Sequence, residues 1–306
     1  MPNAQLAAIR RRWDRGWFNW RCRHILQTPP LRLDPKADVV VVSQLYSPDV
    51  TMYLLAAKSF ARYVPIREFE IVDDGLTRNE RELLQEHLGR VHFTPIASVD
   101  TGSCPRGGCW ERFFTLARRN LGSYVIQLDS DTLTISRPSE VLDCISASRT
   151  FTLGTPTGRN LVSVEAASQN AAADPHPHVQ NRAEQALVRL TNSKQLLYVR
   201  GCAGFTGFGT GQLRLDRIEE LSAELAALLG KDVFSQWGSE QVMSNLMASN
   251  APNALVLPVE TYPFWAPGHR TDGLALIHFF GTFRFIEGMY LRQALRVIRV
   301  LAHERC

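Results

Sequence analysis

The sequence predicts an α/β fold, in which a mostly parallel β-sheet carries helices on both of its faces. From residue 38 onward, short apolar runs alternate with amphipathic segments of helical period. This order builds parallel strands joined by crossover helices. Acidic pairs follow two of the apolar runs, at the edge where sheets of this class bind ligands.

The first half of the chain contains the clearest elements. Strands are predicted at residues 39–45, 67–72, 90–96 and 124–128, and helices at 47–63, 77–88 and 110–121. Thr77 and Glu80 have the spacing of a capping box at the start of the second helix. Four strands with helices between them indicate one Rossmann-like sheet.

The second half contains weaker signals. Strands are predicted at residues 149–156, 195–209, 254–260 and 274–280, and helices at 180–190, 217–230, 238–249 and 286–305. Residues 157–180 are small and polar, and they predict a long loop. Long loops in compact domains are often functional, so this segment is a candidate lid or acceptor loop.

Residues 1–37 are predicted to form a basic helical extension with a proline-rich connector, and residues 38–306 one domain. Apolar residues recur at helical spacing in the extension, namely Leu6, Ile9, Trp13, Trp17 and Trp20. Six arginines against one aspartate give residues 1–26 a net charge of +5, whereas the whole chain carries +4. Either the tryptophans pack on the body of the protein, or the helix makes peripheral contact with an anionic membrane.

The composition argues against several other classes. The basic charge belongs to the first segment and not to the predicted domain, so no nucleic-acid partner is expected. No apolar run is long enough to span a membrane, and the N-terminus lacks the apolar core of a secretory signal. The six cysteines are scattered, and Cys104 and Cys109 alone do not make a zinc motif. We therefore expect reduced thiols in a cytoplasmic protein.

Asp129 and Asp131 directly follow the strand predicted at 124–128. Residues two apart in an extended chain point the same way, so these carboxylates should repel each other. A divalent cation removes the repulsion, and Mg²⁺ or Mn²⁺ suits oxygen ligands that leave positions open for phosphates. The alternative is an ordinary turn, because aspartate is common where strands end.

Four further segments accompany Asp129-Ser130-Asp131. They are "EIVDDG" (70–75), "ERFFTLARRNLGSYVIQLDSDT" (111–132), "SEQVMSNLM" (239–247) and "IHFFGTFRF" (277–285). As an ordered set, they resemble the motifs of nucleotide-diphospho-sugar glycosyltransferases of the GT-A fold. The last segment is similar to the C-terminal His-x-x-Gly-x-x-basic element of family 8 glycosyltransferases. The resemblance covers roughly residues 38–290.

The resemblance implies a metal and phosphate site. Asp129, Asp131 and His278 would bind Mn²⁺ or Mg²⁺, with Asp129 also close to the diphosphate. Gly281 would let the backbone approach a phosphate, and Arg284 would hold that phosphate through a bidentate contact. Each residue also has a structural alternative, such as a core histidine at the end of a strand.

The resemblance also implies contacts to the rest of the donor. Asp73 or Asp74 would contact the base or ribose, unless they only form a turn with the following glycine. Arg118 would reach the nucleotide or diphosphate. Glu240 and Gln241 would face the donor sugar. The implied donor is a UDP-sugar, and the acceptor, whether a saccharide, a lipid-linked molecule or a protein, is not implied.

The chain departs from the family 8 pattern in three places. Cys202-Ala203-Gly204 stands where that family has an Asn-x-Gly strand, Glu240 stands in place of an aspartate, and Arg284 begins the segment that replaces Lys-Pro-Trp. The stereochemical outcome therefore stays open. An inverting enzyme needs a carboxylate base, for which Glu240 is the candidate. A retaining enzyme does not require that base, and Gln241 then matters more.

Two other functions fit parts of the pattern. Haloacid-dehalogenase-type phosphatases also place Asp-x-Asp after a strand and use the first aspartate as a nucleophile. They have Thr or Val two residues after the second aspartate, where this chain has Leu133. The third possibility is a non-catalytic GT-A-like scaffold that binds a partner or a membrane through its N-terminal helix.

Overall fold

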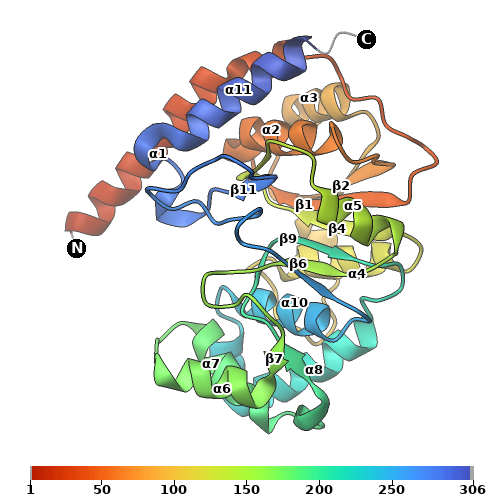
Figure 1. Ribbon diagram of the computed structural model, residues 1–306, viewed down its shortest axis with the longest axis vertical. Coiled ribbons are helices and arrows are strands. Elements are labelled where there is room, and N and C mark those ends of the chain that lie inside the picture. The colour runs from red at the N-terminus through yellow and green to blue at the C-terminus, as the bar shows by residue number, and fades with distance from the viewer. Residues whose placement is uncertain (1, 304–306) are drawn as a thin grey trace.

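The computed structural model describes residues 2–303, with side chains described throughout that range except at 2–9, 11 and 282. Within it, the main sheet has seven strands in the order β10-β6-β9-β4-β1-β2-β3 (Figure 1). They are β1 Val39–Leu45, β2 Glu68–Asp73, β3 Val91–Pro95, β4 Tyr124–Leu128, β6 Phe151–Leu153, β9 Cys202–Phe208 and β10 Leu255–Leu257. Two small sheets pair β5 Thr132–Thr134 with β11 Leu276–His278, and β7 Val162–Ser163 with β8 Leu197–Tyr198.

The strand directions confirm the predicted α/β fold. β4, β1, β2 and β3 run parallel, and β10 runs parallel to β6. β9 is the exception, since it runs antiparallel between β4 and β6. Val39 and Val41 of β1 face one hydrophobic core, whereas Val40 and Val42 face the other. Successive side chains of a strand alternate between its faces, so the sheet is buried on both.

Helices cover both faces of this sheet. The core on one face includes residues of α1 Pro2–Cys22, α2 Val50–Ala61, α3 Arg78–Leu88, α5 Ser139–Ser146 and α11 Met289–His303. The other core includes residues of α4 Trp110–Asn120, α6 Val164–Ala173, α7 Val179–Ala186, α8 Leu215–Leu229, α9 Lys231–Phe234 and α10 Ser239–Ser249. The 3-10 helices are η1 Arg23–Gln27, η2 Ser47–Asp49, η3 Ile96–Ser98, η4 Leu187–Arg189, η5 Ser193–Gln195, η6 Gly281–Phe283 and η7 Ile286–Gly288. The predicted capping box of α3 is present.

The prediction of a long loop over residues 157–180 is wrong. β7, α6 and the start of α7 occupy much of this segment. Val164, Ala167 and Ala171 repeat at helical spacing and are buried, and the Ser163 hydroxyl accepts a hydrogen bond from the backbone N–H of Ala166. The apolar face of α6 consists mainly of alanine, so it gives little hydrophobic signal in the sequence although alanine favours helix.

α1 packs on the body through a different face from the one expected. Phe18 and Cys22 are fully buried, whereas Trp13, Trp17 and Trp20 are exposed by 75%, 54% and 53%. The alternative in which the tryptophans pack on the body is therefore wrong. The predicted apolar contacts of residues 6 and 9 lie outside the described side chains. No helix in the described range is long and apolar enough to cross a bilayer.

Candidate functional site

The candidate metal ligands come from the ends of two strands. Asp129 follows β4, where its backbone N–H donates to the carbonyl oxygen of Gly204 at 2.8 Å. Asp131 leads into β5, and its carbonyl oxygen accepts from the backbone N–H of Phe279 at 2.8 Å. His278 ends β11, the partner of β5. Pairing between β5 and β11 therefore brings residues almost 150 positions apart to one point.

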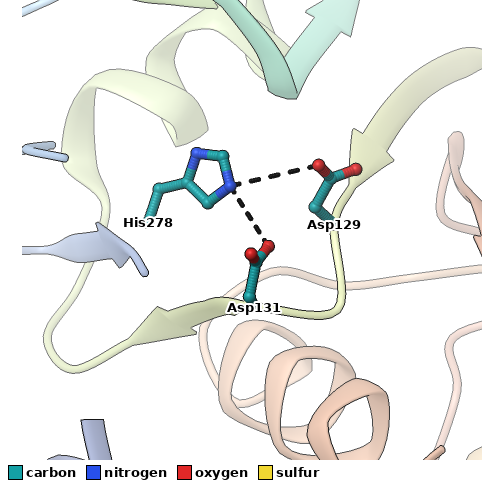
Figure 2. Close-up of side chains that lie close together, drawn as sticks. All are labelled: Asp129, Asp131 and His278. Atoms are coloured by element: carbon teal, nitrogen blue, oxygen red, sulfur yellow. Dashed lines mark hydrogen bonds and ion pairs between the residues drawn. The ribbon is translucent and has the colours of Figure 1, made fainter. Parts of the chain in front are cut away.

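Three ligand atoms of Asp129, Asp131 and His278 lie within 4.8 Å of one another. Figure 2 shows Nε2 of His278 facing both carboxylates, at 3.1 Å from Asp131 and 4.0 Å from Asp129. A Cβ atom at Gly204 would lie 2.4 Å from Cε1 of His278 and 2.9 Å from a carboxylate oxygen of Asp129. Only glycine leaves this space free. Two oxygens and an imidazole nitrogen fit a divalent cation, with Mn²⁺ accepting the nitrogen more readily than Mg²⁺.

The expected repulsion between the two carboxylates is offset by separate cations. Arg112 of α4 forms an ion pair with Asp129, and Arg284 forms one with Asp131. Burial acts to raise the pKa of Asp131, but His278 and Arg284 outweigh it and lower the pKa to about 2. Burial raises the pKa of Asp129 despite the opposing charge of Arg112. Asp131 is therefore the more firmly ionised of the two.

His278 is fully enclosed between these carboxylates and Cys202. Burial acts to lower the pKa of His278, but the charge of Asp131 outweighs it and raises the pKa well above the ordinary 6.5. Its Nδ1 atom lies 3.6 Å from Sγ of Cys202. A ligating histidine needs a partner on its other ring nitrogen, and the sequence analysis did not identify one. Cys202 lies next to that second ring nitrogen. The sequence analysis noted this residue only as a departure from a family motif.

A cavity of about 270 Å³ opens beside the three ligands. Its lining comes from the start of α4, the ends of β4 and β11, the start of β9 and the start of α10; it comprises Gly108, Cys109, Arg112, Asp129, Asp131, Cys202, Ala203, Gly204, Trp237, Gly238, Glu240, Gln241, His278, Phe280, Gly281 and Arg284. The predicted residues Glu240, Gln241, Gly281 and Arg284 therefore share one cavity with the metal-type cluster. Segments separated by up to 176 positions along the chain meet here.

Arg112 connects the metal-type cluster with α10. Its guanidinium pairs with Asp129 and lies 3.6 Å from Glu240. Burial raises the pKa of Glu240 to about 7, although Arg112 acts in the opposite direction. Gln241 follows in the same turn, and its amide nitrogen donates to the side chain of Gln180 at 3.0 Å. The cavity thus holds a carboxyl group that titrates near neutrality beside an oriented amide.

The structure does not bring Arg118 to this cavity, which corrects the sequence-based expectation. Arg118 donates to the backbone carbonyl of Asp100 and lies over the ring of Phe114. α4 precedes β4 and runs antiparallel to it, so its first turn lies at the carboxyl edge of the sheet and its last turn at the opposite edge. Six residues of helix span about 9 Å. Arg112, in the first turn, therefore takes the position proposed for Arg118, and this reasoning was available from the sequence.

Asp73 and Asp74 lie at the end of β2, outside the lining of this cavity. The carboxylate of Asp73 accepts from the backbone N–H groups of Gly75 and Leu76 and pairs with Arg81 at 2.6 Å. Asp73 thereby stabilises the turn before Gly75, which is the structural role that the sequence analysis gave as the alternative to a nucleotide contact. Asp74 is exposed and accepts a long hydrogen bond of 3.3 Å from Gln44.

Comparison with known proteins identifies the fold. No family model and no curated protein sequence matches this chain. The structure of the galactosyltransferase LgtC, in complex with donor and acceptor sugar analogues, matches at a TM-score of 0.53 and 12% identity, over 86% of this chain and 95% of LgtC. The fold is GT-A. The bifunctional glycosyltransferase WbbM matches at a TM-score of 0.52 and 13% identity, over 88% of this chain and 51% of WbbM, so the GT-A chain described here spans about half of that protein.

Proposed function

We propose that this chain transfers a sugar from a nucleotide-diphosphate sugar to an acceptor, with a divalent cation in its site. The observation that carries the proposal is the Asp129–Asp131–His278 cluster beside β4 of a GT-A fold. Three ligands of this kind leave coordination positions open for the oxygens of a diphosphate. Glu240 and Gln241 line the same cavity and offer polar contacts to a sugar.

The cation is Mn²⁺ or Mg²⁺, and when bound it supplies Lewis-acid stabilisation of the charge on the leaving diphosphate. Arg284 shares that charge. Its guanidinium already pairs with a carboxylate at the wall of the cavity, and its planar fork matches phosphate oxygens. Gly281 has a φ of 59° and no Cβ, so its backbone can approach a phosphate closely.

The donor proposed from the family resemblance is a UDP-sugar. We assign the contact with the base or ribose to Asp73 or Asp74, of which Asp74 has the freer carboxylate. Arg112 replaces Arg118 as the basic residue of α4 that faces the donor. LgtC, described as a complex with donor and acceptor sugar analogues, supports the proposal that this chain also takes two sugars. The cysteines at 22, 104, 109, 144 and 202 are free thiols, which favours a cytoplasmic setting.

Glu240 and Gln241 correspond to two stereochemical outcomes. In an inverting reaction, Glu240 would accept the proton of the acceptor hydroxyl, a role that its pKa of about 7 suits. In a retaining reaction no such base is required, and Gln241 would act next to the sugar ring. Comparing the anomeric configuration of donor and product decides between them.

The test is ligand binding followed by turnover. Nucleotide diphosphates and their sugars are screened for a rise in melting temperature with and without Mn²⁺, because a ligand of the folded state stabilises it. We expect a UDP-dependent rise that requires the metal, together with slow hydrolysis of the matching donor sugar. Release of phosphate from phosphate esters would instead support the phosphatase. The absence of both donor hydrolysis and phosphate release would support the non-catalytic scaffold.

A further inference from the structure

The outer face of α1 carries a row of three exposed tryptophans. Trp13, Trp17 and Trp20 are spaced i, i+4 and i+7, so they follow one side of the helix. At 100° per residue, the buried Phe18 and Cys22 fall on the opposite side. The tryptophan row therefore points directly away from the body. The rings of Trp17 and Trp20 stack at 5.1 Å, and a groove of about 660 Å³ runs along the row.

Guanidinium groups flank the tryptophan row on both sides. Arg21 lies over the ring of Trp17 at 5.4 Å, and Arg23 lies over the ring of Trp20 at 4.7 Å. Arg12 lines the groove. On the helical wheel of α1, Arg12 falls on one side of the row and Arg21 on the other, and Arg23 begins η1 directly after the helix. Tryptophan with flanking cations is the combination that stabilises a helix at the headgroup level of a lipid layer.

α11, which packs against α1, carries a row of exposed basic residues. Arg292, Arg296 and Arg299 have the same i, i+4, i+7 spacing, and all three are exposed. The segment Met289–His303 contains no acidic residue. α1 and α11 lie side by side at one end of the molecule (Figure 1), where the ring of Phe18 stacks on Tyr290 at 4.3 Å. Aromatic and basic rows thus share this end of the protein.

We propose that α1 and α11 form a docking surface for an anionic lipid membrane, with the tryptophan row at headgroup depth and the arginines against lipid phosphates. Charge complementarity selects this occupant over a second copy of the chain, because a self-contact would oppose one arginine-rich surface to another. Juxtamembrane basic residues gain attraction from each anionic headgroup they approach. Large exposed apolar patches rimmed by polar groups mark interaction surfaces of this kind.

This surface is connected to the candidate active site. Arg15 of α1 lies 3.3 Å from Asp49, which accepts a hydrogen bond of 3.3 Å from Ser130, between the two aspartate ligands. Exposed Phe280 lines the cavity of the candidate active site. If the proposed sugar transfer is correct, docking favours an acceptor anchored in the same lipid layer. That consequence rests on the proposed function, whereas the docking itself does not.

The test is co-sedimentation of the full chain with vesicles of phosphatidylcholine alone or mixed with phosphatidylglycerol, without nucleotide or metal. We expect binding to the anionic vesicles only, weakened as salt shortens the Debye length from about 8 Å at physiological ionic strength to about 3 Å at 1 M. Trp13→Ala/Trp17→Ala/Trp20→Ala should reduce the partition coefficient by roughly tenfold or more. Arg292→Gln/Arg296→Gln/Arg299→Gln should reduce it on anionic vesicles as well.

The control is Leu121→Ala, which removes an apolar side chain of similar exposure, 72%, outside α1 and outside the candidate active site. It should bind vesicles as the wild type does, and melting curves check that each variant is folded. Equal sedimentation with neutral and anionic vesicles, or unchanged binding by the triple tryptophan variant, would overturn the proposal. The proposal would also be overturned if the wild type forms a dimer in size-exclusion chromatography, the triple tryptophan variant does not, and neither protein binds vesicles. Because no donor is present in the vesicle experiment, a negative result does not bear on the proposed sugar transfer. Likewise, a failure to detect sugar transfer does not bear on membrane docking.

Discussion

The Nη2 atom of Arg112 lies 3.6 Å from a carboxylate oxygen of Glu240, and both side chains are buried. The same guanidinium pairs with Asp129. One arginine of α4 therefore links the metal-type cluster to the residue that would face the sugar. Burial keeps the pKa of Glu240 near 7 even with this cation close by, so its charge changes in the neutral range.

Glu240→Gln should remove a pH dependence from the stability of the fold. The unfolded chain releases the Glu240 proton near the ordinary value of 4.5, and the folded chain releases it near 7. Between these values the folded state binds more protons, so its stability falls as pH rises and levels off above 7. Urea denaturation should show that, between pH 4.5 and pH 8, the unfolding free energy of the wild type falls by a few kcal/mol relative to that of the variant. Glu82→Gln, at an exposed position of α3, is the control; parallel curves for wild type and Glu240→Gln would contradict the assignment.

Asp131→Ala should abolish Mn²⁺-dependent binding of nucleotide diphosphate and also weaken the ligand-free fold. The sequence suggested that removing one of two neighbouring carboxylates relieves repulsion. In the structure Asp131 instead neutralises Arg284 and His278, and leaving buried cations unpaired costs about 3 kcal/mol of unfolding free energy. Calorimetry measures the binding and urea denaturation the stability. Asp143→Ala, at an exposed position of α5, should change neither; wild-type affinity in Asp131→Ala would refute the metal role.

His278→Ala should weaken Mn²⁺ more than Mg²⁺, because a neutral imidazole suits Mn²⁺ better than the oxygen-preferring Mg²⁺. The gap between the two metals in donor hydrolysis should therefore narrow. Wild-type activity with Mn²⁺ should also decline as pH falls, since a protonated imidazole cannot coordinate. His92→Ala removes a half-exposed histidine of β3 and serves as the control. An unchanged preference between the metals would make His278 a structural residue.

Cys202→Ala should lower Mn²⁺ affinity roughly tenfold without unfolding the protein, because the His278 ring loses the contact at its Nδ1 atom. Cys202→Ser keeps a group that can donate or accept and should restore most of the affinity. Titration of Mn²⁺ followed by electron paramagnetic resonance reads the affinity directly. Cys144→Ala removes another buried thiol, in α5, and should leave it unchanged. Equal affinity in the alanine and serine variants would show that Cys202 does not position the ring.

The order of the elements from β1 to β4 and the edge of the sheet at which the site lies can be predicted from the amino-acid sequence. The alternating pattern of β1, α2, β2, α3, β3, α4 and β4 is local, because each short apolar run or amphipathic segment carries its own period. Asp129 and Asp131 could be predicted as site residues because they directly follow β4 in the sequence. The split into residues 1–37 and 38–306 stays a prediction. α6 escaped notice because its buried face is mostly alanine.

Which charged side chains meet depends on long-range packing. Arg112, Glu240 and Arg284 lie far apart in the sequence, and only the packing of α4, α10 and the segment after β11 brings them around the cluster. The same holds for Cys202, whose contact with His278 depends on β9 running antiparallel beside β4. Helical periodicity predicts that α1 is amphipathic, but it cannot say which side finds a partner. The buried side of α1 is set by long-range packing, because Phe18 and Cys22 contact apolar residues of the body. The tryptophans consequently face outward.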